Sequence, residues 1–294
     1  MKKYYLMGVE KKNIEAMLYL CNFYYYKHEH EKLFKYCTMI IKNVSILNIS
    51  IYYNINNWYG LSYFNNYKGL AYFYLGYYYE IHEKYEEMKI FYTTSIDLNM
   101  TCAMYNLGYY YYLIKDYESM KKYLLMACNN NHINAMFVLG YYYSMIEIDY
   151  NKMKKYYMMA GKLRCVQSLY NLGYYYQYIE KDYNKMKKCY LIANEYETNY
   201  KANIHMARHY RDIKQKYDKM IKYNLIAMIQ NYKDSVKEFS ENYKYVINYD
   251  FVDNELVKIL ENNDIEYYLY MLVIDNRDKL PKTVKYLEEN YENF

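Results

Sequence analysis

The chain has 294 residues, of which 54% are apolar and 24% charged, and it contains 53 tyrosines, eight glycines and a single proline. The net charge of +5 is mild for this length and argues against a nucleic-acid or membrane-surface partner, which would need charge concentrated on one face. No apolar run reaches the roughly 18–20 residues that span a bilayer, and we expect no signal peptide, because the N-terminus lacks its apolar core. So few helix breakers predict a nearly all-helical chain with short turns.

Six cysteines are spread along the chain without close pairing: Cys21, Cys37, Cys102, Cys128, Cys165 and Cys189. Disulfides form in oxidising compartments, and disulfide-rich domains show closely spaced cysteines. The spacing therefore predicts reduced thiols and a cytoplasmic location.

Residues 1–15 match the second helix of a repeat that recurs further along the chain. Met1–Tyr4 aligns with Met120–Tyr123, and an Ala-Met pair follows both after the same interval. We therefore predict a partial repeat that lacks its first helix, and its unpaired apolar stripe would allow end-to-end self-association. Residues 16–40 are predicted to form a divergent repeat, and 41–67 a degenerate repeat or a helical insert.

Residues 68–232 carry a clear internal repeat. The glycines Gly76, Gly108, Gly140 and Gly173 are spaced by 32 or 33 residues, and Ala207 holds the next equivalent place. Methionines keep step with them: Met88, Met120, Met153, Met186 and Met220. A period near 33 is typical of stacked units, none of which can bury its apolar face alone. The pattern predicts five repeats over 68–232, followed by capping helices over 233–294.

One repeat, residues 102–129, shows how the unit folds. Its first half places apolar residues at i, i+3, i+4 and i+7, which is one stripe of a helix: Met104, Leu107, Gly108 and Tyr111. Glycine within a helix costs about 1 kcal/mol against alanine, so we expect a second helix to approach closely there. Asp116 is placed to cap that second helix, as are Asp149 and Asp182 in the next repeats. Each repeat is thus an antiparallel helical hairpin.

This pattern resembles the Sel1-like repeat, a branch of the tetratricopeptide superfamily. The matching residues are Ala103, Leu107, Gly108, Tyr111, Asp116, Tyr117, Lys121, Tyr123 and Ala127, with their counterparts in the next units. The resemblance implies an all-α fold, a right-handed α-solenoid of antiparallel helical hairpins with repeats of about 33 residues. Proteins of this kind are typically scaffolds that bind other proteins. The glycine-rich turn between the helices of Sel1 repeats is absent.

No motif for catalysis or cofactor binding stands out. The chain has no glycine-rich phosphate loop, no Ser/His/Asp motif and no CxxC pair, so we expect a non-enzyme without cofactor or metal. His205 and His209 have the spacing of metal ligands on a helix, but the glutamate of HExxH is missing. A second grouping matches no known zinc spacing: Cys21, His28, His30 and Cys37.

Aromatic residues flank each repeat glycine. If the hairpins stack as in the tetratricopeptide superfamily, the residue after the glycine faces a concave groove, and so does the residue three before it. Tyrosine is favoured at binding surfaces because it adds large area at little entropy cost. The predicted partner-binding residues are Tyr77, Tyr109, Tyr141, Tyr174 and Arg208, with Tyr112, Gln177 and Arg211 further along the same helices. The alternative is that these rings only pack between repeats.

The function predicted from these features is a non-enzymatic scaffold that binds a peptide or helix of a partner protein in the groove. The alternative is a single-stranded RNA binder, because helical repeats with aromatic positions can stack bases. The candidate groove carries no basic stripe, which argues against RNA. One line of it reads Glu80, Tyr112, Ser144, Gln177 and Arg211.

Overall fold

The structure is a computed structural model that describes residues 2–47, 67–197, 199–246, 248–261 and 267–290. Every regular element in these ranges is a helix, which confirms the predicted all-α class. The chain divides into two compact units, Met1–Ile148 and Asp149–Phe294, and each is described by itself. Of the predicted degenerate repeat at 41–67, residues 48–66 lie outside the described ranges.

Unit 1 contains α1 (Lys2–Glu10), α2 (Ile14–Tyr26), α3 (His30–Leu47), α4 (Tyr67–Ile81), α5 (Tyr85–Asp97), α6 (Thr101–Leu113), α7 (Tyr117–Asn129) and α8 (Ile133–Met145). Unit 2 contains α9 (Tyr150–Lys162), α10 (Val166–Tyr178), α11 (Tyr183–Tyr196), α12 (Tyr200–Asp212), α13 (Tyr217–Gln230), α14 (Tyr232–Asn242), a short 3-10 helix (Tyr243–Tyr245), α15 (Tyr249–Leu260), α16 (Tyr267–Asp275) and α17 (Pro281–Asn290).

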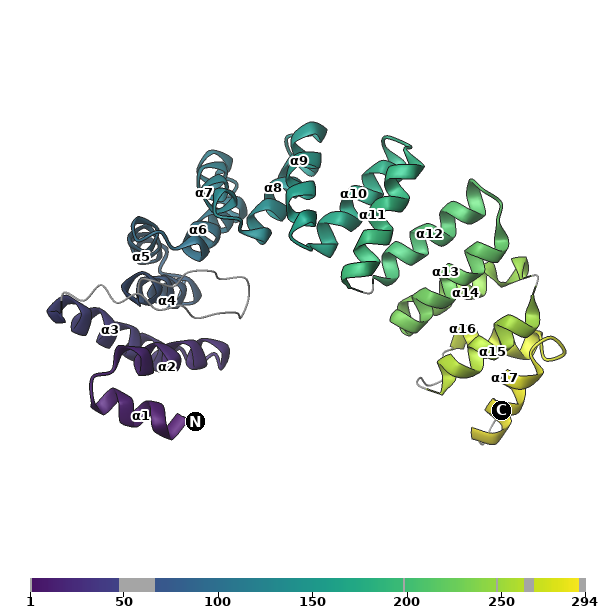
Figure 1. The fold of residues 1–294 in the computed structure, drawn as a ribbon, viewed down its shortest axis with the longest axis horizontal. Helices are drawn as coiled ribbons and strands as arrows, with labels where there is room; N and C mark the ends of the chain where they lie inside the picture. The colour runs from purple at the N-terminus through teal and green to yellow at the C-terminus, as the bar shows by residue number, and fades with distance from the viewer. Residues whose placement is uncertain (1, 48–66, 198, 247, 262–266, 291–294) are drawn as a thin grey trace. The chain divides into compact units, whose positions relative to one another are not determined.

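In unit 1, and from α9 to α14 in unit 2, helices that follow one another in the sequence pack together (Figure 1). The closest pairs are the hairpins α2/α3, α4/α5 and α6/α7 in unit 1, and α10/α11 and α12/α13 in unit 2. We call the first helix of a hairpin helix A and the second helix B. Each helix B also packs against the helix A that follows it, so a hairpin contacts its neighbours on both sides, as expected of a repeat array.

Each helix B begins where the sequence predicts. Asp116 accepts the N–H of Ser119 at 3.1 Å, and Asp182 accepts the N–H groups of Asn184 and Lys185 at 3.2 and 3.0 Å. Asp149 caps α9 in the same way. The residue before each cap has a left-handed backbone, with φ of 62° at Lys115, 55° at Ile148 and 57° at Lys181. These turns therefore use the conformation that glycine favours without having a glycine there.

One of these turn residues, Ile148, is β-branched, for which a positive φ is a strained conformation. Its side chain is 54% exposed, so little packing offsets the strain. We expect Ile148→Gly to stabilise the fold by about 1 kcal/mol, because glycine adopts a left-handed backbone without a steric penalty. Thermal unfolding checks this, with Met158→Gly as the control at an exposed place inside α9, which should destabilise. A lower unfolding temperature for Ile148→Gly would contradict the argument.

The repeat glycines let the two helices of a hairpin meet. A methyl group at Gly108 would lie 2.8 Å from Cδ2 of Leu124, and one at Gly173 would overlap the ring of Tyr190. Gly76 stands in the same relation to Tyr92. The predicted close approach is thus confirmed at these three positions.

Where helix A has a side chain at the glycine position, the facing residue on helix B is smaller. Cys21 contacts Cys37, with the two sulfur atoms 3.4 Å apart in the core of α2/α3. In α12/α13 the glycine position is Ala207, and the aligned helix-B residue is Asn224 in place of the tyrosine at 190. The pairs conserve roughly the same summed volume, which is the condition for close packing.

The last helices of unit 2 share one core with α12 and α13, built from residues such as Leu225, Phe239 and Leu256. Asp253, which is 1% exposed, accepts the backbone N–H groups of Lys282 and Thr283 at 2.9 and 2.8 Å. A carboxylate on α15 therefore caps α17, whose first residue is proline.

Among the described helices of unit 1, α1 packs against α2. It leaves Tyr4 76% and Met7 48% exposed.

Candidate interaction surface

Three consecutive tyrosines follow the glycine on helices α4, α6, α8 and α10. Residues in an α-helix are offset by about 100° around the axis, so the three rings point in three directions. The contacts of each ring show which of the three tyrosines is accessible to a partner protein.

The third tyrosine of each triplet packs inside its own hairpin. Tyr79 stacks on Phe91 with ring centroids 5.1 Å apart, and Tyr111 stacks on Tyr123 at 5.7 Å. In both pairs the planes are nearly parallel, at 2° and 4°. This tyrosine holds helix A to helix B.

The second tyrosine packs against helix B of the preceding hairpin, where it meets the tyrosine that begins that helix. The ring centroids are 5.4 Å apart for Tyr110 and Tyr85, 5.1 Å for Tyr142 and Tyr117, and 5.1 Å for Tyr175 and Tyr150. A lysine from the same helix B lies over each ring: Lys89, Lys121 and Lys154, at 5.7, 5.9 and 5.5 Å. Cation–π contact adds to the packing, so this tyrosine joins one repeat to the next.

The first tyrosine is the one that neither contact uses. Tyr109, Tyr141 and Tyr174 are 37%, 39% and 47% exposed. Tyr77 is less exposed, because its ring lies 4.7 Å from Tyr25 of the preceding hairpin.

In unit 1 the exposed Tyr109 lies in a stacked row on α6 with two half-buried tyrosines. The centroid of Tyr109 lies 5.9 Å from both Tyr105 and Tyr112, and Tyr105 stacks at 4.6 Å on His132. We call Tyr105, Tyr109, Tyr112 and Tyr141 the tyrosine stripe of unit 1. Burial lowers the pKa of His132 to about 4, and its Nδ1 accepts the N–H of Ala135 at 3.3 Å. The stripe is therefore uncharged at neutral pH.

The tyrosine stripe of unit 2 consists of Tyr170, Tyr174 and Tyr178 and is organised by His205. The hydroxyls of Tyr170 and Tyr178 lie 3.1 and 3.2 Å from its two ring nitrogens. Tyr190 stacks on the imidazole at 5.9 Å. Burial, with a smaller effect of Arg208, lowers the pKa of His205 to about 4, so this imidazole is also neutral.

Gln177, predicted at the binding surface, has a structural role. It is 8% exposed, and its side-chain oxygen accepts the hydroxyl of Tyr190 at 3.2 Å. Glu80 does the same for Tyr92 at 2.5 Å, and burial raises the pKa of this carboxyl. Both tyrosines face repeat glycines, so residues four beyond the glycine satisfy buried hydroxyls that would otherwise destabilise the core.

The following hairpin supplies a second partner for such hydroxyls. Asn106 donates to the hydroxyl of Tyr92 at 3.0 Å, and Asn171 donates to that of Tyr157 at 3.1 Å. Where helix B has Leu124 in this place there is no hydroxyl, and the next hairpin has Val138. The tyrosine of helix B and the asparagine of the next hairpin are thus lost together. This paired change is visible in the sequence and indicates that residues bound to these hydroxyls, such as Gln177, pack inside the array.

Arg208 and Arg211 are engaged with α14. Arg208 donates from two nitrogens to Glu238, at 3.2 and 2.7 Å, which is a bidentate ion pair. Arg211 donates to Asn242 at 2.8 Å. Glu238 is largely buried, and its pKa is lowered by Arg208 although burial opposes that shift. Both arginines therefore have a packing role that the sequence analysis did not assign to them.

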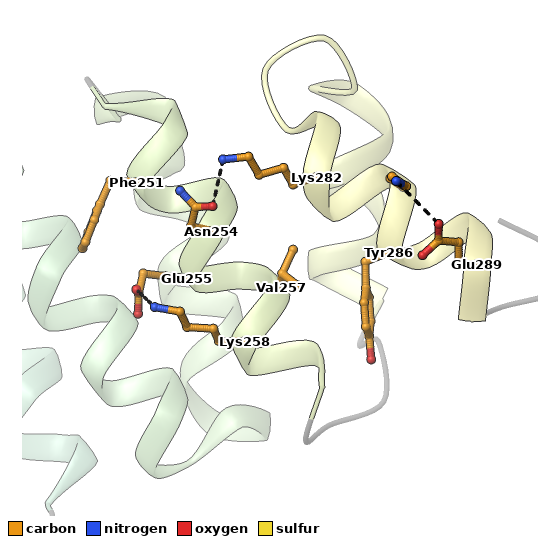
Figure 2. A pocket seen from close by; sticks show the side chains of 9 residues that line it. Phe251, Asn254, Glu255, Val257, Lys258, Lys282, Tyr286 and Glu289 are labelled. Carbon is orange, nitrogen blue, oxygen red and sulfur yellow. Dashed lines mark hydrogen bonds and ion pairs between the residues drawn. The ribbon is translucent and has the colours of Figure 1, made fainter.

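Other candidate sites are weaker. Among the described residues, no group of three or more His, Cys, Asp or Glu side chains is placed to hold a metal. A hollow of about 680 Å³ lies between α15 and α17 (Figure 2), but its charged residues pair with one another, as Lys258 does with Glu255 at 2.7 Å. No helix in the described ranges is long and apolar enough to cross a membrane.

The described fold is similar to two solved structures. One is a Sel1 repeat protein from Oxalobacter formigenes, with a TM-score of 0.55 and 19% identity over 79% of this chain and 90% of that one. The other is a protective antigen of uropathogenic Escherichia coli with an SLR fold, with a TM-score of 0.60 and 12% identity over 98% of this chain. This chain covers 63% of the antigen's length.

At these identities the likeness concerns the fold, and it confirms the predicted Sel1-like solenoid of helical hairpins. No protein-family model matches the chain. No curated protein sequence matches it either.

Proposed function

We propose that the chain is a non-enzymatic scaffold that binds a helix or an extended peptide of a partner protein along the tyrosine stripes. The observation that carries this proposal is that the three tyrosines of a triplet make different contacts. Two of the three rings are used for packing, whereas Tyr109, Tyr141 and Tyr174 stay exposed in successive repeats. Packing alone gives no reason to keep a large aromatic residue at an exposed place in each repeat, and exposed tyrosines are common anchors at interfaces.

The partner-binding set is narrowed by the contacts above. Tyr109, Tyr112 and Tyr141 in unit 1 and Tyr174 in unit 2 remain in it. Tyr77 stays as a half-buried member. Gln177, Arg208 and Arg211 contribute through the packing that supports the stripes, because their polar groups are engaged with Tyr190, Glu238 and Asn242.

The unit 1 stripe offers a direct test. Once a partner has been identified by pull-down, we expect Tyr109→Ala with Tyr141→Ala to weaken binding by about 2 kcal/mol or more, which is roughly 30-fold. The matched control is Ile90→Ala with Leu125→Ala, because these side chains are 62% and 37% exposed on helix B, away from the stripe. Titration calorimetry measures the affinities, and thermal unfolding confirms the fold. Equal losses in both double variants would place the interface elsewhere.

Single-stranded RNA is the alternative ligand for exposed rings, since bases stack on tyrosine. The uncharged unit 1 stripe favours a protein, because RNA binding depends on cations that contact phosphates. A salt titration separates the two: a steep loss of affinity with salt indicates RNA.

We propose a cytoplasmic location, since all six cysteines are free thiols and five of them are buried. End-to-end self-association through the exposed face of α1 stays a prediction.

A further inference from the structure

A four-residue charge cluster recurs where the turn of one hairpin meets helix B of the hairpin before it. In unit 2, Glu180 pairs with Lys154 at 3.2 Å and with Lys185 at 2.9 Å. Asp182, the cap of α11, also pairs with Lys185, at 2.9 Å. The equivalent positions one repeat earlier are Lys121, Glu147, Asp149 and Lys152. Lys121 pairs with Glu147 at 3.7 Å within unit 1, and Lys152 pairs with Asp149 at 3.2 Å within unit 2. Both sets of positions hold two acids and two lysines, so their charge is balanced.

One repeat later, both acids are replaced by lysine. The residues equivalent to Lys154, Glu180, Asp182 and Lys185 are Lys187, Lys214, Lys216 and Lys219, which we call the lysine cluster. None of the four has an ion pair with a carboxylate in the part of the chain that the structure describes. The pKa of Lys187 is lowered first by burial and then by repulsion from Lys214, Lys219 and Lys216. Lys187 and Lys219 both lie over the ring of Tyr210, and Lys214 and Lys216 belong to the turn that precedes α13.

The helix start inside the cluster lacks its cap. Lys216 is the N-cap residue of α13 and makes no side-chain hydrogen bond to the first turn, whereas Asp182 makes two in α11. The N-cap residue of α13 thus supplies no acceptor at the end of the helix that attracts anions, and Asp218 is the acidic residue of the first turn.

A buried histidine next to the cluster also lacks partners. His209 is 1% exposed, and neither of its ring nitrogens has a hydrogen bond. Burial, helped by Lys187 and Lys214, lowers its pKa to about 4. Its neighbour Tyr210 has Lys187 and Lys219 over its ring, at 5.7 and 5.5 Å.

The lysine cluster destabilises the fold, because like charges repel and the helix cap is missing. A role in stability therefore does not explain why these lysines are present. We propose that the lysine cluster binds a phosphate monoester, carried on a phosphorylated serine or threonine of a partner segment. A phosphate dianion brings nearly two negative charges and three acceptor oxygens, which matches several ammonium groups beside a helix start that has lysine in place of the aspartate cap.

The surroundings favour a single phosphate over a nucleic-acid backbone. Asp212 and Asp218, both exposed, lie in the same hairpin on either side of the turn that carries Lys214 and Lys216. Asp212 is paired with Arg211, whereas the carboxylate of Asp218 would repel a chain of phosphates that extended past the cluster. The site does not depend on the tyrosine stripes.

The first test uses inorganic phosphate and a variant that restores the balanced cluster, Lys214→Glu with Lys216→Asp. We expect phosphate, at constant ionic strength set with chloride, to raise the unfolding temperature of the wild type by a few degrees. The restored variant should unfold at a higher temperature without phosphate and should lose the phosphate effect. The control Lys155→Glu with Lys162→Asp makes the same change in net charge at exposed lysines of α9 and should keep the effect. Equal phosphate effects in the wild type and the restored variant would overturn the site.

The second test identifies the source of the phosphate. We expect a phosphoserine peptide library to yield binders at least tenfold tighter than the same peptides without phosphate, with that ratio lost in the restored variant. Single-stranded RNA is the other arm. If RNA bound in a manner that depended on Lys214 and Lys216, and no phosphopeptide did, the assignment to a phosphorylated peptide would be wrong.

Discussion

Gly173→Leu is expected to cost 3 kcal/mol or more of unfolding free energy, which is the upper part of the range for overpacking a core. Even a methyl group at this position would overlap the ring of Tyr190, which is fully buried and held by Gln177 and His205. The ring cannot move aside without breaking these contacts. Chemical denaturation of the purified variant measures the loss.

The control is one residue further along the helix. Tyr174→Leu makes the same new side chain at a place that is 47% exposed, so we expect a change below about 1 kcal/mol. If both variants unfolded alike, the two helices would not meet at the glycine, and the repeat model would be wrong.

Acid is expected to destabilise unit 2 below pH 6.5. His205 and His209 both lie on α12, and burial lowers the pKa of each to about 4. The folded state thus binds fewer protons than the unfolded chain, whose histidines titrate near 6.5. Stability is therefore fully present above about pH 7 and is lost as the pH falls from 6.5 towards 4. We expect a loss of about 2 kcal/mol or more from His205 alone.

A variant of His209 separates this effect from the titration of carboxylates. Neither ring nitrogen of His209 has a hydrogen bond, so His209→Phe removes a buried polar group without leaving a partner unsatisfied. We expect it to raise the stability at pH 7 by about 1 kcal/mol and to make the loss between pH 6.5 and 4.5 smaller. Denaturation midpoints across this pH range provide the measurement. An unchanged pH dependence would mean that the pKa of His209 is the same in the folded and the unfolded chain.

The helical hairpins, the helix B caps and the close approach at the glycines could be predicted from the sequence, because each depends on local or periodic signals. A glycine in the apolar stripe of a helix predicts close approach by another helix, and this prediction does not depend on which residue faces the glycine. Asp116 and Asp182 precede a helix by a fixed interval, which is enough to identify a cap.

The roles of Arg208 and Gln177 needed the structure. Glu238, the partner of Arg208, lies on α14, beyond the periodic region, so no repeat signal connects the two. Gln177 was grouped with surface residues by its helix register, but its role is set by the hydroxyl of Tyr190 on another helix. The helix register predicts the side of the helix on which a residue lies, but it does not identify the residue that its side chain contacts.

The hydrogen bonds between helix-B tyrosines and the asparagines of the next hairpin limit how this array can gain or lose repeats. A whole repeat is the natural unit of duplication or loss, yet each hairpin is fitted to the one that follows it. Loss of the 33 or so residues that begin at α6 would bring Tyr92 next to Val138 in place of Asn106, and the hydroxyl would keep Glu80 alone. Exchange of the hairpins with Leu124 and Tyr190 would leave a mismatch at the junction that follows each of them. Recombination between these similar segments would therefore leave single hydrogen bonds unmade, and the order of the repeats is part of what the sequence encodes.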